Sequence, residues 1–208
     1  MIKTLTYTLL MIKKISLLCI GLFFTTHSFS NYSELLQEKT QHYFQNEREY
    51  TKINFNQERT LIGFENSLKS KGSLRILSKS DLVYSQESPR VETLKIRDGE
   101  LILPNTSANS NTTNLKNALY FQKVYALLSA VISGQHLEIE KNYTVQLTKS
   151  QNIWKIKLTP KSKDLKSLYK SVWLQGNQKL TNIAVINTDN SSLEINFYGE
   201  KTYSKKKI

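Results

Sequence analysis

The 208-residue sequence is poor in the residues that carry covalent chemistry or hold metal ions. It has one Cys, three His, three Pro and seven Gly. The single Cys, Cys19, lies in the first 30 residues, so a chain that loses this segment has neither a disulfide nor a thiol, and its fold must rest on packing. His42 and His136 are far apart and belong to no group with metal-ligand spacing, so we predict neither a metal site nor a cofactor.

The motifs of common catalytic sites are missing as well. There is no G-x-S-x-G turn for a nucleophilic Ser and no Gly-rich loop that could cradle a phosphate. A pair of Glu could act as the acid and base of a glycosidase. Four Glu fall in predicted strands, where a solvated sheet face is the favoured interpretation: Glu58, Glu92, Glu138 and Glu140. We therefore predict a binding protein with no catalytic residue.

The N-terminus has the order of a secretory signal. Lys13 and Lys14 precede the apolar run ISLLCIGLFF, and the small residues of SFS follow at 28–30. The apolar run is shorter than the roughly 20 residues that span a bilayer. We predict a signal peptide over residues 1–30 and one monomeric periplasmic domain over residues 31–208. Met11 is an alternative start, and lipidation of Cys19 is the alternative to cleavage after Ser30.

The chain is strongly basic, with a formal net charge of +12. Such a charge suits nucleic acid, anionic lipid head groups or solubility alone. The Lys residues are scattered apart from KKK at 205–207. Nucleic acid does not suit an exported chain, so no nucleic-acid partner is expected.

The first half of the chain predicts one short helix and a meander of about five antiparallel strands. Residues 34–46 have a helical pattern after Ser33, a plausible N-cap. Apolar and polar residues then alternate with a period of two, as in half-buried strands. The predicted strands cover residues 53–61, 68–76, 82–84, 90–96 and 100–103, and Asp98-Gly99 is the strongest hairpin-turn dipeptide.

The second half predicts one long helix and six further strands. A polar loop over residues 104–114 precedes the helix, which covers about residues 115–133 and ends at Gly134. Its apolar face is broader than that of a surface helix. It is either buried on two sides, or packed on the sheet and facing an apolar ligand. The strands, at residues 136–140, 143–148, 153–160, 168–176, 180–187 and 192–199, bring the total to about eleven strands and two helices.

Several local signatures, in this order, resemble those of the LolA-like family of periplasmic carriers of outer-membrane lipoproteins. They are FNQER (55–59), SKGSLRI (70–76), LVYSQESP (82–89), LKIRDGEL (94–101) and IWKIKLTPKSKDL (153–165). They match the family features F-x-Q, G-x-L, W-or-Y-x(4)-P, D-G and W-x-L-x-P. The resemblance implies an open antiparallel half-barrel of eleven strands, closed by a helical lid over lipoprotein acyl chains. It also implies an inner-membrane exporter as donor and an outer-membrane acceptor.

One position departs from the family pattern. Well-studied members carry an Arg six residues after the Gly of the second strand, where it bonds to the lid. Here that position is Ser78, followed by Lys79, which a continuing strand would point to the opposite face. The lid latch is therefore missing or replaced. Another acyl lipid, a glycolipid or a lipid intermediate is then an alternative to lipoprotein as cargo.

We predict that one face of the meander and the long helix line an apolar cavity for lipid. The candidate lipid-binding residues are Phe55, Leu74, Ile76, Leu82, Tyr84, Leu94, Ile96, Leu119, Val124, Leu127, Leu128, Trp154, Ile156, Leu158 and Trp173. Each could instead belong to an ordinary core. The predicted function is a carrier of lipoprotein or related acyl lipids. A lipid-sensing or adaptor protein with the same half-barrel is the alternative, and a small hydrolase with a Glu pair is a third hypothesis.

Overall fold

The structure, a computed structural model, describes residues 30–98, 100–102 and 112–205. Within this range, the side chains of residues 30, 31, 112–119 and 121 are not described. The predicted signal, including Cys19 and both possible start residues, lies outside the described part of the chain. Residues Tyr32–Ile208 form one compact unit.

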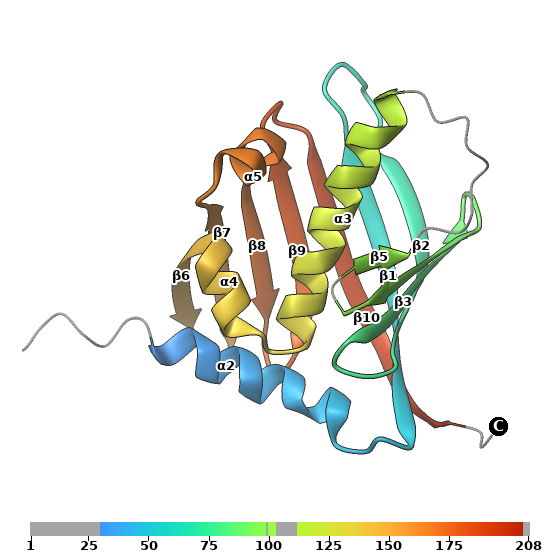
Figure 1. Ribbon diagram of the computed structural model, residues 1–208, viewed down its shortest axis with the longest axis vertical. Helices are drawn as coiled ribbons and strands as arrows, with labels where there is room; N and C mark the ends of the chain where they lie inside the picture. Colours follow the sequence, from blue (N-terminus) through green and yellow to red (C-terminus); the bar gives the residue numbers. More distant parts are fainter. Residues whose placement is uncertain (1–29, 99, 103–111, 206–208) are drawn as a thin grey trace, which may run out of the picture. The chain divides into compact units, whose positions relative to one another are not determined.

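A single antiparallel sheet of ten strands dominates the unit (Figure 1). Its first meander contains β1 (Glu49–Thr60), β2 (Leu68–Ile76), β3 (Asp81–Ser88), β4 (Glu92–Arg97) and β5 (Glu100–Ile102). The second contains β6 (Tyr143–Ser150), β7 (Ile153–Pro160), β8 (Tyr169–Gly176), β9 (Leu180–Asn187) and β10 (Ser192–Ser204). The sheet order, β5-β4-β3-β2-β1-β10-β9-β8-β7-β6, joins the meanders through their first and last strands.

Helices cover one face of this curved sheet. α3 (Thr112–Ile132) follows β5, at one edge, and leads through α4 (His136–Asn142) to β6, at the other edge. In Figure 1, α3 crosses in front of the sheet, and α2 (Ser30–Thr40), with the 3-10 turn η2 (Gln41–Phe44), runs along one end of it. The short α5 (Lys163–Leu168) contacts β8. The arrangement is an open half-barrel under a helical cover, as predicted.

The strand pattern follows from the period-two alternation of the sequence. Every second side chain in these strands points toward the helices and is buried, as for Ile53 and Phe55 in β1 and Leu74 and Ile76 in β2. The polar residues between them face away. The turn between β4 and β5 contains Asp98 with φ +52°, in keeping with the predicted hairpin; Gly99 lies outside the described residues. The predicted five-strand meander is confirmed.

Three parts of the secondary-structure prediction are wrong. Residues 136–140, predicted as a strand, form α4, so the sheet has ten strands, and Glu138 and Glu140 lie on a helix. Residues 163–168, assigned in part to a turn, form α5, capped by the Ser162 side chain, which accepts a hydrogen bond from the Leu165 amide. The first helix ends at Thr40, and η2 follows it.

No helix in the described part of the chain combines the length and apolar character needed to cross a bilayer.

Candidate functional site: a covered apolar face

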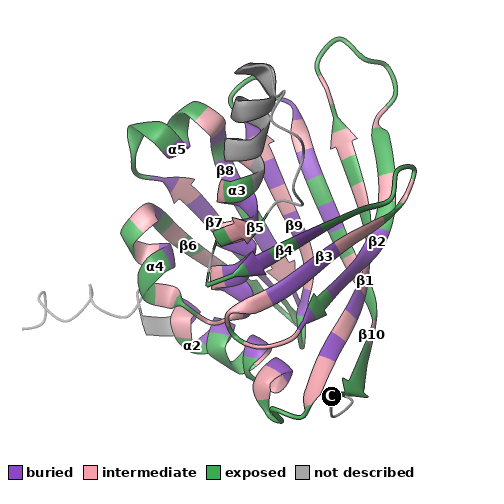
Figure 2. Cartoon of the chain, turned by 45° about the vertical axis from the view of Figure 1, so that its right-hand side comes forward, coloured by how far each residue is buried: buried purple, intermediate pink, exposed green. Residues whose placement is uncertain are grey.

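The concave face of the sheet carries one continuous apolar surface. Most of the predicted lipid-binding residues meet there: Phe55, Leu74, Ile76, Leu82, Tyr84, Leu94 and Ile96 from the first meander, Trp154, Ile156 and Leu158 from the second, and Val124, Leu127 and Leu128 from α3. All belong to one cluster of buried side chains. Figure 2 shows this burial along the sheet strands. The side chain of Leu119, also in α3, lies outside the described residues.

Trp173 lies on the other face. It sits opposite Lys157 and Ala184 in the sheet, it is 37% exposed, and the Lys157 Nζ lies 5.3 Å from its ring centroid. A register shift between Tyr169 and Ser171 changes the alternation of β8, so Val172 and Leu174 point inward instead. The placement of Trp173 on the concave face is therefore corrected.

Several residues of the concave face were not singled out from the sequence. They are Val172, Leu174, Ile183, Val185, Leu193 and Ile195 from the sheet, and Tyr32, Leu36, Ile139 and Leu165 from the helices. The residues of β9 and β10 alternate with outward-facing positions, so the period-two signal used for the first meander would have found them. Val172 and Leu174 follow the register shift in β8, which the sequence does not show.

The concave face is filled by side chains rather than open. Phe55, Leu74, Ile156 and Leu158 have no exposed surface, and the other apolar members of the buried cluster are at most 7% exposed. Toward the sheet edges Leu101, Val145 and Leu147 are only partly buried. α3 supplies Val131 and Ile132 to this packing in addition to its predicted residues. A ligand can therefore reach the buried centre of this face only if the helical cover moves. A pocket of about 470 Å³ already lies between the helices beside Leu127, Ile139, Tyr143 and Leu165.

Tyr hydroxyls are buried within this otherwise apolar contact. The Phe55 and Tyr84 rings stack at 4.6 Å between centroids, and Tyr125 of α3 lies 5.0 Å from Tyr84. The Tyr84 hydroxyl donates to Gln57 Oε1 at 2.9 Å. Burial raises the pKa of both Tyr84 and Tyr125 above the usual value for tyrosine.

A second pair of Tyr hydroxyls lies on the side of the second meander. Tyr143 and Tyr169, the first residues of β6 and β8, have stacked rings and share a hydrogen bond between their hydroxyls. Burial again raises the pKa of both groups. The covered face thus offers hydrogen-bonding groups at two places on an apolar background.

The C-terminal end of α3 is tied to the turn between β2 and β3. The Ser133 hydroxyl donates a hydrogen bond to the Lys79 carbonyl oxygen. The Lys79 Nζ lies 5.9 Å from the centroid of the Phe44 ring in η2, a cation–π distance. Lys79 is therefore in a turn rather than a strand, and it contacts both helical segments.

Ser78, at the position of the family's latch, has a local role. Its Oγ accepts hydrogen bonds from the amides of Asp81, at 3.1 Å, and Ser80, at 3.3 Å, and so closes the turn. No described contact links its side chain to α3. The contact between this turn and the lid is made one residue along, through the backbone of Lys79.

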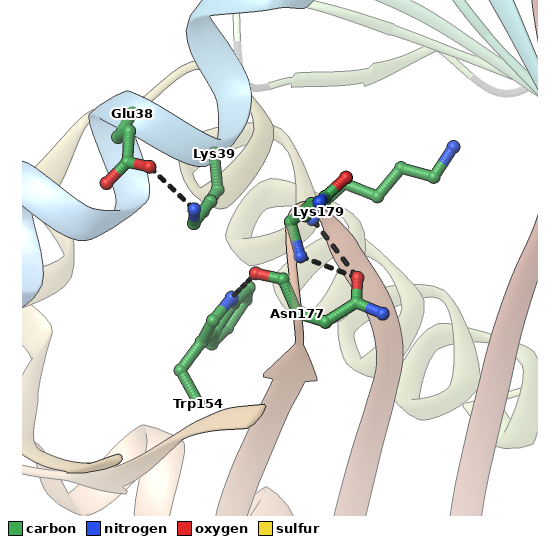
Figure 3. A network of polar contacts seen from close by, with 6 residues as sticks. Glu38, Lys39, Trp154, Asn177 and Lys179 are labelled. Atoms are coloured by element: carbon green, nitrogen blue, oxygen red, sulfur yellow. Dashed lines mark hydrogen bonds and ion pairs between the residues drawn. The ribbon is translucent and has the colours of Figure 1, made fainter. Parts of the chain in front are cut away.

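A pocket of about 510 Å³ lies where α2 meets the hairpins of the second meander, with Leu35, Lys39, Lys149, Trp154 and Asn177 among its lining residues. Figure 3 shows Trp154 there, its Nε1 donating to the Asn177 carbonyl oxygen at 2.7 Å. In α2, Lys39 pairs with Glu38 at 2.6 Å. Because Trp154 also belongs to the concave cluster, this mixed polar pocket adjoins the apolar face.

Within the described ranges, no group of three or more His, Cys, Asp or Glu residues could hold a metal ion. The geometry describes a class of protein fold: a half-barrel with its apolar concave face beneath a helical cover. Residues 46–192 match the family model described as "Outer membrane lipoprotein carrier protein LolA-like". The chain belongs to this LolA-like family.

Comparisons with other proteins show how divergent this member is. No curated protein matches the chain. Solved structures share 9–11% sequence identity with it. A LolA superfamily protein from Nitrosomonas europaea has a TM-score of 0.40 at 9% identity, over 85% of this chain and 94% of its own. MucB in the MucA/MucB complex of Pseudomonas aeruginosa has a TM-score of 0.43 at 11% identity, over 84% and 58% of the two chains.

A putative outer-membrane lipoprotein-sorting protein domain from Vibrio parahaemolyticus has a TM-score of 0.29 at 10% identity, over 82% of this chain and 91% of its own. At these scores the structural likenesses carry no argument about function. The site has to be interpreted from its own residues.

Proposed function

We propose that this protein is a periplasmic carrier that binds the acyl chains of lipoproteins or related lipids on its concave face. It would receive them from an inner-membrane exporter and pass them to an outer-membrane acceptor. The observation that carries this proposal is the nature of the cover. α3 contacts the sheet through apolar side chains such as Val124, Leu128 and Val131, and no ion pair joins it to the sheet among the residues that the structure describes.

Apolar contacts are non-directional, so an acyl chain can replace them. Each methylene that leaves water contributes about 0.8 kcal/mol. A long acyl chain therefore supplies free energy of the same kind as the apolar contacts that α3 loses when it lifts, and so can offset them. Ion pairs across the same interface would resist this exchange, because separating them would leave a charge unpaired.

The buried Tyr residues favour an amphiphile over a plain hydrocarbon. When α3 lifts, Tyr125 loses its side-chain hydrogen bond with Tyr84, whereas Tyr84 keeps Gln57 as a partner. A hydroxyl left without a partner in an apolar site costs about 1–3 kcal/mol. Ester or hydroxyl oxygens of a lipid could satisfy such groups. The mixed polar pocket beside α2 and Trp154 offers room for a head group next to the acyl site.

Mass spectrometry of lipids extracted from the protein, after purification from the periplasm of its native cells, tests the proposal. We expect a defined acyl lipid in near-stoichiometric amount. Absence of lipid, together with no displaceable binding of a fluorescent fatty acid, would contradict a carrier function. Recovery of a tightly bound protein partner without lipid would favour the adaptor alternative.

Trp154 supplies a second measurement. The chain has two Trp, so Trp173→Phe leaves Trp154 as the only one. Trp154 is 3% exposed and lies beside α2. If loading lifts the cover, its emission should shift to the red and acrylamide should quench it more readily. Unchanged emission at saturating lipid would show that this part of the cover stays in place.

A further inference from the structure

Four cations from four different strands line up across the first half of the sheet. Lys52 of β1 lies directly opposite Lys201 of β10 on one side and Arg75 of β2 on the other. Arg75 lies opposite Val83 of β3, which lies opposite Lys95 of β4. With strands about 4.8 Å apart, the line from β10 to β4 is about 19 Å long. We call Lys201, Lys52, Arg75 and Lys95 the basic row.

The basic row lies on the convex face, away from the helices. Directly opposite residues in a sheet point to the same side, and neighbours along a strand point to opposite sides. Ile53, Leu74 and Ile96, each next to a member of the row, are buried in the concave cluster. Lys201, Arg75 and Lys95 are exposed and Lys52 is half-buried. Val83 is only 5% exposed, in keeping with cover by the long aliphatic stems beside it.

Acidic residues do not neutralise this row. None of its four cations makes an ion pair with any residue in the described ranges. Asp81 and Glu100, in the next line of side chains, both lie opposite Arg97, and Asp81 pairs with Arg97 at 3.0 Å. On the other side the neighbours are neutral: Asn54, Ser73, Ser85 and Thr93.

Like charges directly opposite each other destabilise a sheet. The fold therefore gains nothing from Lys52 facing both Lys201 and Arg75. Aromatic and apolar side chains flank the row: Tyr50 and Tyr203 stack at 5.3 Å, Tyr198 is 48% exposed, and Ile102, opposite Lys95, is 44% exposed. Lys and Arg with Tyr at their edges are the residues that meet the head-group layer of a membrane.

We propose that the basic row docks the protein on an anionic phospholipid surface. The cations contact lipid phosphates, and Tyr198, Tyr203 and Ile102 enter the head-group layer beside them. The row is about 19 Å long and lies on an open sheet face, which suits the extended phosphate layer of a membrane. Because the row is on the face opposite α3, the protein can dock while its cover remains free to open. The proposal does not depend on what the concave face binds.

Co-sedimentation with vesicles tests this proposal. The vesicles contain phosphatidylcholine alone or phosphatidylcholine mixed with phosphatidylglycerol. We compare the unaltered protein with Lys52→Gln/Arg75→Gln and with Lys95→Gln/Lys201→Gln. The matched control is Lys163→Gln/Lys166→Gln in α5, which removes the same charge elsewhere. Thermal unfolding of each variant is recorded in parallel.

We expect binding only to the phosphatidylglycerol vesicles, weakening with salt. Each cation removed should lower the partition coefficient about fivefold, so each double variant of the row loses about 25-fold. The control variant should lose far less. Lys52→Gln/Arg75→Gln should melt at the same or a higher temperature, because it removes like-charge pairs.

Three results would overturn the proposal: equal loss in the control variant, equal binding to uncharged vesicles, or full competition by a soluble acidic polypeptide at equal charge. The last would show that the row takes an acidic protein instead.

Discussion

The hydroxyl of Ser133, the residue after α3, donates a hydrogen bond to the backbone carbonyl of Lys79 in the turn between β2 and β3. This contact joins the end of the long covering helix to the sheet of the first meander. It is a neutral bond to a carbonyl oxygen, of a kind that contributes about 0.5–1.5 kcal/mol. Ser78, where the resemblance to the family places a latch, makes no described contact with α3.

Ser133→Ala should loosen the cover. Loss of this hydrogen bond should lower the free energy of unfolding by about 0.5–1.5 kcal/mol. It should also raise amide hydrogen exchange near the end of α3 and speed the uptake of a fluorescent fatty acid. Ser167→Ala is the control, because the Ser167 hydroxyl donates to the Asp164 carbonyl within α5. Equal acceleration in both variants would show that the Ser133 bond does not restrain the cover.

Ser78→Arg should make the cover harder to open. A guanidinium there is one residue from the carbonyl that Ser133 contacts, and charge-assisted bonds to the end of α3 would contribute about 1.5–3 kcal/mol. Retention of a fluorescent fatty acid should fall by about tenfold or more, with melting of the empty protein unchanged or higher. Ser78→Ala controls for the lost turn bonds. Unchanged or stronger retention would mean that this position cannot act as a latch here.

Gly72→Ala should strongly destabilise the folded protein. A Cβ at this position would lie 2.0 Å from the Ser85 carbonyl oxygen and 2.7 Å from Phe55 Cζ. The neighbouring strand cannot move away without breaking the ladder, so we expect a loss of about 3 kcal/mol or more. Gly63→Ala is the contrast, since nothing lies within 4 Å and only its φ of +84° is unfavourable. Urea unfolding of both variants measures the difference; similar losses would contradict this account.

The buried Tyr residues should make the protein sensitive to alkaline pH. Burial raises the pKa of Tyr84, Tyr125 and Tyr169 in the folded state, whereas an unfolded tyrosine has a pKa of about 10. The folded state thus binds more protons above pH 10. The contribution of these Tyr residues to the free energy of unfolding should be constant below about pH 10 and fall as pH rises further. Urea unfolding at several pH values, with tyrosinate absorbance, checks this.

Tyr84→Phe should make that fall shallower, because one of the groups that must stay protonated is gone. A pH dependence identical to that of the unaltered protein would show that Tyr84 ionises without opening the core.

The positions of most strands could be predicted from the local order of apolar and polar residues. Alternation of apolar and polar residues predicted β1 through β4, and it also fixed which side chains face the core, as Phe55, Leu74 and Ile156 show. Successive side chains of a strand point to opposite faces of the sheet, and here one face is buried and the other is exposed. The direction of each side chain can therefore be inferred from the order of apolar and polar residues. The concave face was therefore largely predictable, including the part of α3 that covers it.

Where the local residue pattern fitted both a helix and a strand, tertiary packing determined the secondary structure. Residues 136–140 alternate as a strand would, but five residues fit either period. In the fold they follow α3 directly and form α4, burying Ile139 and leaving Leu137 69% exposed. β6, which comes next, is already the edge of the sheet. The bulge in β8 had a similar effect on Trp173, because a one-residue shift moves every following side chain to the other face.

The register in which the strands pair could be learned only from the tertiary structure. The sequence shows scattered Lys and Arg residues with no visible grouping. Pairing of β1 with both β2 and β10 brings Lys52, Arg75 and Lys201 side by side, although up to 149 residues separate them. Strand pairing depends on backbone hydrogen bonds that are the same for every residue, so only the burial of the whole concave face selects one register.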